Sequence, residues 1–235
     1  MSPEVTLVLT HGAWADGSGW GEVIDAVEAA GVRAVAAPLT LTSLEDDVAA
    51  LDHTLEHAGG PVVLAGHAYA GAVIGSTRAE NVRALVYVAA LAPDEGETVA
   101  EVFGRGAPHQ DAPALVPDAH GLIWLPDAAF AAAFAQQASA SQQVRLRAAQ
   151  RPISITCITE AVGRPRWRDR PSWFLVAAED RMITAQNQRF MAERMDASVR
   201  EHPVDHMVML TRPAVVTDLL LEVAEEVRKD LSGHG

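Results

Sequence analysis

Residues 63–72, VLAGHAYAGA, run from an apolar stretch straight into a turn of small residues. Gly66 and Gly71 bracket this turn, and the small residues after it begin a helical pattern. Glycines permit a tight backbone at such a junction, which lets the side chain at its tip project outward. The tip position is Ala68. The segment therefore predicts a buried strand that passes directly into a helix, the local unit of a parallel α/β sheet.

The same alternation of short apolar runs and longer helical patterns extends along the chain on both sides of this segment. Helical connections between strands imply parallel pairing and a right-handed, doubly wound sheet, which we expect to be mostly parallel. The expected strands are residues 5–10, 32–37, 62–65, 84–89, 173–177 and 198–202, and the expected helices are residues 19–30, 43–56, 71–78, 185–195 and 213–230.

One stretch, residues 94–170, breaks the alternation. It is rich in Ala, Gln and Pro, shows no clear strand between residues 89 and 173, and carries helical patterns at 126–138 and 141–150. We interpret it as a helical cap inserted into a single domain that spans residues 1–235, because a chain of this length fits one domain.

Composition narrows the function classes. Apolar residues make up 49% of the chain and charged residues 21%, which is typical of a globular protein. The 18 Lys and Arg against 31 Asp and Glu give a net charge of −13 without a basic stripe, so nucleic acid is not an expected partner. No apolar run is long enough to span a bilayer, so no membrane association is expected.

Cellular location is predicted from the cysteine count and the start of the chain. Cys157 is the single cysteine, which excludes an internal disulfide framework and fits a reducing compartment. The first residues lack the pattern of a secretory signal, so we expect a cytoplasmic protein whose mature chain begins here. The sequence leaves the oligomeric state open, with a homodimer among the alternatives.

Chemically capable residues follow four expected strands. Open parallel sheets bind ligands beyond the carboxyl ends of their strands. The segments at those ends are residues 10–14 (THGAW), 66–71, 179–183 (EDRMI) and 203–207 (PVDHM). A carboxylate that holds one ring nitrogen of His206 would leave the other nitrogen free to accept a proton. Asp180 is the preferred carboxylate, with Glu179 and Asp205 as its rivals.

The four segments together resemble the α/β-hydrolases. The turn at 66–71 resembles their nucleophile elbow, Gly-x-Ser-x-Gly, and the order elbow, acid, histidine is also theirs. In detail the chain is similar to the branch of plant methylesterases and hydroxynitrile lyases and their bacterial relatives, through residues 11–14, 66–71, 179–183 with 188–191, and 205–210.

The resemblance implies specific roles. Asp180 would be the acid of the catalytic triad and His206 its base, and the backbone N–H groups of Ala13 and Tyr69 would form the oxyanion hole. The main departure is Ala68 at the nucleophile position, because a methyl group cannot attack a carbonyl. Ala70, where the pattern has its second Gly, is a milder departure.

Two explanations of Ala68 remain open, an engineered replacement of a serine and a native alanine. With a serine at 68 the chain would be a carboxylic ester or lactone hydrolase. With alanine, the base and the oxyanion hole suit lyase or isomerase chemistry without a covalent intermediate, or attack by water that His206 assists. A non-catalytic protein that binds small molecules is the third alternative.

The substrate class is predicted only in outline. Trp14, His67 and Trp124 are the candidates for substrate contact, and the cap adds Phe103, His109, His120, Phe130 and Phe134. These residues favour a small apolar or aromatic substrate, although each of them could serve packing alone. The nine histidines lack zinc-type spacing, and the implied chemistry needs neither a metal nor an organic cofactor.

Overall fold

Six strands form the central sheet, in the order β2-β1-β3-β4-β7-β8. The structure is a computed structural model that describes residues 4–233, so both ends of the expected domain of residues 1–235 lie outside the described residues. All five strand pairings are parallel, which confirms the predicted doubly wound sheet. The strands are β1 (Thr6–Thr10), β2 (Ala34–Ala37), β3 (Val62–His67), β4 (Val82–Val88), β7 (Ser172–Ala177) and β8 (Ser198–His202).

The inner strands are buried on both faces. Every residue of β1, β3 and β7 is buried, whereas edge strand β8 is largely exposed. The sequence of a strand that is covered on both faces is a continuous apolar run. Apolar and polar residues do not alternate in it, because neither set of side chains contacts water. This is why residues 62–65 could be predicted as a core strand.

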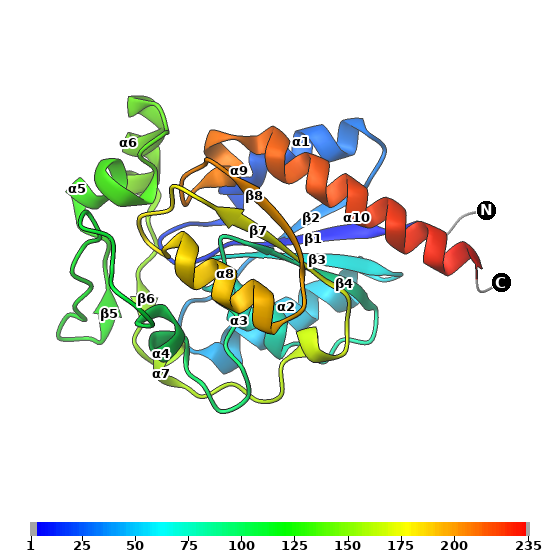
Figure 1. Cartoon of the computed structure of the whole chain (residues 1–235), viewed down its shortest axis with the longest axis horizontal. Helices are drawn as coiled ribbons and strands as arrows, with labels where there is room; N and C mark the ends of the chain where they lie inside the picture. Colours follow the sequence, from blue (N-terminus) through cyan, green and yellow to red (C-terminus); the bar gives the residue numbers. More distant parts are fainter. Residues whose placement is uncertain (1–3, 234–235) are drawn as a thin grey trace.

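Helices cover the two faces of the sheet (Figure 1). One layer consists of α1 (Gly21–Ala29) and α10 (Pro213–Gly233), with the short α9 (Val208–Thr211) beside them. The other consists of α2 (Leu44–Ala58), α3 (Ala70–Ser76) and α8 (Ala185–Arg194). Within residues 4–233, none of the helices has the length and apolarity that a membrane span requires.

Most of residues 94–170, from α4 to α7, lie at one end of the sheet, at the left of Figure 1. The segment contains α4 (Val99–Phe103), β5 (Leu122–Ile123), α5 (Asp127–Ala129), a π-helix (Phe130–Phe134), α6 (Ala140–Ala149), β6 (Ile153–Ser154), α7 (Thr156–Thr159) and, just before β7, 3-10 helix Arg166–Arg168.

Two expectations for this segment need correction. Strands β5 and β6 pair as an antiparallel ribbon where no strand was expected, and two residues are too few to give an alternating pattern. The helix expected at 126–138 ends at Phe134. Its last five residues, Phe130–Phe134, have π-helical geometry. The helix expected at 141–150 is confirmed as α6.

Sheet order places the candidate residues. Strand β1 pairs with β2 on one side and β3 on the other, so the direction of winding reverses there. A crevice opens at such a reversal, beyond the carboxyl ends of the strands. The ends of β1, β3, β7 and β8 face the 94–170 segment, and these are the four ends singled out from the sequence (Figure 1).

Candidate active site

The turn after β3 has the sharp geometry that its glycines predict. Ala68 lies there with φ +50°, a conformation that costs a non-glycine residue about 1–3 kcal/mol. The Ala68 carbonyl accepts hydrogen bonds from the N–H groups of Gly71 (3.1 Å) and Leu91 (2.9 Å). A Cβ on Gly66 would lie 2.8 Å from the carbonyl oxygen of Ala70, so the turn closes only over a glycine. Alanine at position 70 is accommodated, because helix α3 begins at that residue.

The predicted pairing of His206 with Asp180 is present. The Nδ1 atom of His206 lies 2.7 Å from Oδ2 of Asp180, and both side chains are buried. Asp180 Oδ1 accepts the N–H groups of Met182 (2.7 Å) and Ile183 (2.9 Å), and the amide of Gln188 donates to Oδ2 at 2.9 Å. This set of donors fixes the carboxylate, which in turn fixes the imidazole ring.

The two rival carboxylates have other partners. Asp205 accepts from the Gln137 N–H (2.9 Å) and from the Thr211 hydroxyl (2.5 Å), and burial raises the pKa of Asp205. Glu179 accepts from the side-chain amide of Gln137 at 2.7 Å. Neither reaches the imidazole of His206, so Asp180 is its carboxylate partner.

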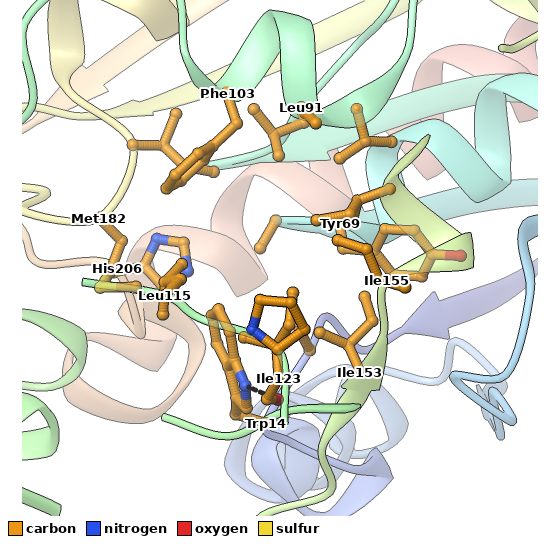
Figure 2. Close-up of a pocket in the computed structure, with 17 residues that line it drawn as sticks. Trp14, Tyr69, Leu91, Phe103, Leu115, Ile123, Ile153, Ile155, Met182 and His206 are labelled. Atoms are coloured by element: carbon orange, nitrogen blue, oxygen red, sulfur yellow. Dashed lines mark hydrogen bonds between the residues drawn. The ribbon is translucent and has the colours of Figure 1, made fainter. Parts of the chain in front are cut away.

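The second ring nitrogen of His206 is free. Within residues 4–233 its Nε2 has no hydrogen-bond partner, and the ring lines a cavity next to Ala68 (Figure 2). The backbone N–H groups of Ala13 and Tyr69 also have no acceptor in that part of the chain, and both residues line the same cavity. Ala13, Tyr69 and His206, each with an unpaired nitrogen in that part of the chain, therefore line one cavity together with Ala68.

Hydrogen bonds of the His11 ring hold the turn that carries Ala13. The ring of His11 accepts the Leu39 N–H at Nε2 (3.1 Å) and donates from Nδ1 to the Gly12 carbonyl (2.9 Å). Burial lowers the pKa of His11, which keeps this ring neutral. A Cβ on Gly12 would lie 2.9 Å from the Cβ of Ala68, so only glycine lets the two turns approach this closely.

Asp47 holds the other turn. Its Oδ2 accepts the Tyr69 hydroxyl at 2.8 Å, while its Oδ1 accepts the N–H groups of Thr40 (2.7 Å) and Leu41 (2.8 Å). The phenol of Tyr69 therefore points away from the cavity, as Figure 2 shows, and its pKa is raised by burial and by the charge of Asp47. The sequence analysis missed this role, because Glu45, Asp46 and Asp47 form an acidic first helical turn with no other distinguishing signal.

The cavity above Ala68 has a volume of about 210 Å³ and is predominantly apolar. Among the described residues that line it, no Asp, Glu, Lys or Arg occurs, and His206 provides the only imidazole. We call this space the apolar cavity. Its lining residues are Ala13, Trp14, Ala68, Tyr69, Leu91, Val99, Ala100, Phe103, Leu115, Pro117, Ile123, Ile153, Ile155, Ile158, Met182, Ile183 and His206.

The three residues expected to contact substrate occupy different places. Trp14 lines the apolar cavity (Figure 2). His67 does not, because its side chain is fully buried below the turn and donates from Nε2 to the His206 carbonyl at 2.9 Å. Trp124 is also outside the lining and is 48% exposed. His67 and Trp124 therefore lie outside the lining of the apolar cavity, His67 against the His206 backbone and Trp124 at the surface.

Of the aromatic and histidine residues expected from the cap, Phe103 lines the apolar cavity. Phe134 packs beside the site, with its ring centroid 5.3 Å from that of His206 and 6.1 Å from that of Trp14. Phe130 packs against Phe134, and His109 and His120 lie outside the lining. In residues 4–233 no cluster of three or more His, Cys, Asp and Glu side chains could hold a metal ion.

His67 predicts a pH dependence of stability. Burial, with His206 nearby, keeps its pKa well below the ordinary value of 6.5. The unfolded chain gains a proton here below pH 6.5 and the folded chain does not, so stability falls with acid by up to about 1.4 kcal/mol per pH unit. Urea unfolding at pH 7.5 and 5.5 should show a drop that is about 1 kcal/mol smaller in His67→Gln, which keeps an N–H donor. An equal drop in both proteins would contradict this assignment.

Comparison with known proteins identifies the family of this chain. The sequence profile of the alpha/beta hydrolase family matches residues 7–219, so the chain belongs to the α/β hydrolase family. A comparison with curated proteins gave no match.

Solved structures share this fold over most of both chains. Polyneuridine aldehyde esterase is 20% identical, with a TM-score of 0.80 over 94% of this chain and 99% of its own. A pyrethroid hydrolase from Sphingobium faniae is 20% identical, with 0.76 over 94% and 98%. A methylesterase from Arabidopsis is 16% identical, with 0.76 over 94% and 99%. At these identities the likeness shows the fold.

Proposed function

We propose that the chain hydrolyses small, apolar carboxylic esters or lactones with water that His206 activates directly, without a covalent intermediate at residue 68. The observation that carries the proposal is the free Nε2 of His206 beside the free N–H groups of Ala13 and Tyr69. Esterases and other hydrolases among the structural neighbours support the reaction class.

The reaction needs no group that the chain lacks. Water attacks the carbonyl carbon while Nε2 of His206 takes one of its protons, and Asp180 stabilises the resulting imidazolium through Nδ1. The two N–H groups bind the oxyanion of the tetrahedral intermediate. Collapse of the intermediate breaks the bond to the leaving oxygen, which receives the proton back from His206. The products are the acid and the alcohol, or the hydroxy acid from a lactone.

The apolar lining supports a substrate without charged groups. The walls of the apolar cavity come from residues such as Leu91, Ile155 and Met182 (Figure 2). An ionised group placed there would lose its hydration without gaining a partner, which is costly. A neutral ester with a short alkyl or aromatic acyl group fits this lining.

A second candidate is proton abstraction next to a carbonyl, the first step of lyase or isomerase chemistry. The apolar lining favours proton abstraction, because an attacking water would find few hydrogen-bond partners besides His206 and the two N–H groups. A carbonyl compound would use the same donors for its enolate oxygen, and His206 would take the proton from the adjacent carbon.

One pair of assays tests the proposal and separates it from the second candidate. The unmodified chain is expected to hydrolyse p-nitrophenyl acetate and butyrate over many turnovers, while intact-protein mass spectrometry shows no acyl adduct. His206→Ala is expected to lower the rate by about a hundredfold or more.

Exchange of α-protons of a ketone for deuterium, without ester hydrolysis, would replace the proposal with the second candidate. Absence of both reactions, together with ketone binding that His206→Ala leaves unchanged, would identify a binding protein instead.

A further inference from the structure

A second cavity lies behind Trp14. It has a volume of about 300 Å³ and is bounded by the residues after β1 and by helix α6. Unlike the apolar cavity, it has charged and polar side chains in its wall, from Asp16, Ser18, Gln142 and Arg145. We call it the second cavity.

Trp14 is the one lining residue that the two cavities share. Trp14 is buried, with 8% of its surface exposed. Phe134 packs edge-on against it at 6.1 Å and holds the ring from the side. Trp14 is therefore the residue at which the two cavities adjoin.

The backbone and the cap fix this ring in place. Trp14 has φ +59°, which is rare for a bulky residue and costs free energy. Its N–H donates to the Arg151 carbonyl (3.1 Å) and its indole N–H to the Ile123 carbonyl (2.9 Å, dashed in Figure 2). Both acceptors lie in or beside the β5–β6 ribbon. The 94–170 segment therefore fixes the position of the Trp14 ring.

Helix α6, on the far side of the second cavity, is loosely packed. None of its residues is buried, and Leu146, which lines the cavity, is only half-buried. The second cavity is open to solvent in part, since Ser18 and Arg145 in its wall are exposed, so a group placed there meets few packed neighbours. The second cavity therefore offers additional volume on the other side of Trp14 from the apolar cavity.

We propose that Trp14 determines substrate size: its indole confines the substrate to the apolar cavity, and without it the chain of a longer carbonyl compound extends into the second cavity. This inference rests on the proposed binding of carbonyl compounds above Ala68. It assigns Trp14 a role in specificity, separate from the backbone N–H groups of its neighbours.

Binding of straight-chain 2-alkanones tests the proposal without any need for turnover. Isothermal titration of 2-hexanone and 2-decanone compares the unmodified chain with Trp14→Ala. Each methylene that leaves water strengthens binding roughly fourfold. If Trp14→Ala lets two further methylenes of 2-decanone leave water, it should favour 2-decanone over 2-hexanone about fifteenfold more than the unmodified chain does. Trp14→Phe keeps an aromatic wall and should retain the original preference.

Refilling the second cavity gives the matched control. Leu146→Trp places a large ring there from helix α6, and in the Trp14→Ala background it should remove the gain for 2-decanone. Alone, it should leave ketone binding unchanged. Circular dichroism and thermal unfolding verify that each variant is folded. If Trp14→Ala does not fold, Trp14→Val takes its place in the same comparison.

An unchanged length preference in a folded Trp14→Ala or Trp14→Val, including the absence of any ketone binding, would overturn the partition. So would a gain that Leu146→Trp does not reverse. These outcomes are distinct from failure of the proposed function, which is a lack of His206-dependent turnover or exchange and leaves the ketone series to be measured on its own.

Discussion

Replacing Ala68 with serine is expected to raise the hydrolysis of activated esters by about a hundredfold or more over the unmodified chain. The serine oxygen would project from a turn already held at φ +50°, next to the free Nε2 of His206 and the N–H groups of Ala13 and Tyr69. The reaction would then proceed through an acyl-serine intermediate, whose formation and hydrolysis split one difficult step into two.

Stopped-flow kinetics with p-nitrophenyl butyrate and mass spectrometry of quenched samples measure this gain. A burst of p-nitrophenol and an acyl adduct mapped to residue 68 are the expected signatures. Ala100→Ser is the matched control, because Ala100 lines the same cavity on α4, away from the turn. A rate for Ala68→Ser that matches the rate of Ala100→Ser would show that the turn, the base and the oxyanion hole do not act together.

Removing the carboxylate of Asp180 gives the second large effect. In the Ala68→Ser background, Asp180→Asn is expected to lower kcat about a thousandfold or more, because an amide no longer fixes the imidazole in the tautomer that accepts a proton at Nε2. The buried carboxylate also has three other donors, from Met182, Ile183 and Gln188, so thermal unfolding must accompany the kinetics.

Asp205→Asn distinguishes the carboxylate that acts on His206 from its neighbour in sequence. Asp205 accepts from Gln137 and Thr211, so its replacement weakens hydrogen bonds of about 1 kcal/mol each and should lower kcat less than about tenfold. Glu179→Gln, at an exposed position, should have a smaller effect still. Equal losses in Asp180→Asn and Asp205→Asn would contradict the assignment of the pair.

The pairing of His206 with Asp180 could be predicted because of the order of the strands. Four short segments far apart in the chain each follow a strand, and a parallel sheet brings such ends to one edge. His206 and Asp180 could therefore be paired before their 2.7 Å contact was measured. The glycines at 66 and 71 likewise predicted a sharp turn, since their spacing follows from backbone sterics.

Features that depend on packing between distant segments could not be predicted from the sequence. The hydrogen bond from Tyr69 to Asp47 joins two helices of one face, and nothing local distinguishes Asp47 from the acids beside it. Gln188 lies in a stretch that carries the family resemblance, yet its contact with Asp180 depends on how α8 packs. The second cavity arises from the spacing between α6 and the residues after β1, which no sequence pattern encodes.

His67 shows how a plausible interpretation changed. Its place beside the turn suggested contact with substrate, but the strand alternation turns its side chain inward, where it supports the His206 backbone. Trp124 directly follows strand β5 and is exposed at the surface. Nearness in sequence to the turn or to the 94–170 segment therefore did not predict which side chains line the apolar cavity.

A crystal structure with a bound small lactone or ketone tests the central claim most directly. The account predicts that the carbonyl oxygen lies within hydrogen-bond distance of the N–H groups of Ala13 and Tyr69, with its carbon above the Ala68 methyl group and Nε2 of His206 facing it. A ligand whose carbonyl points away from both N–H groups, or a His206 ring turned away from Asp180 in the complex, would contradict it.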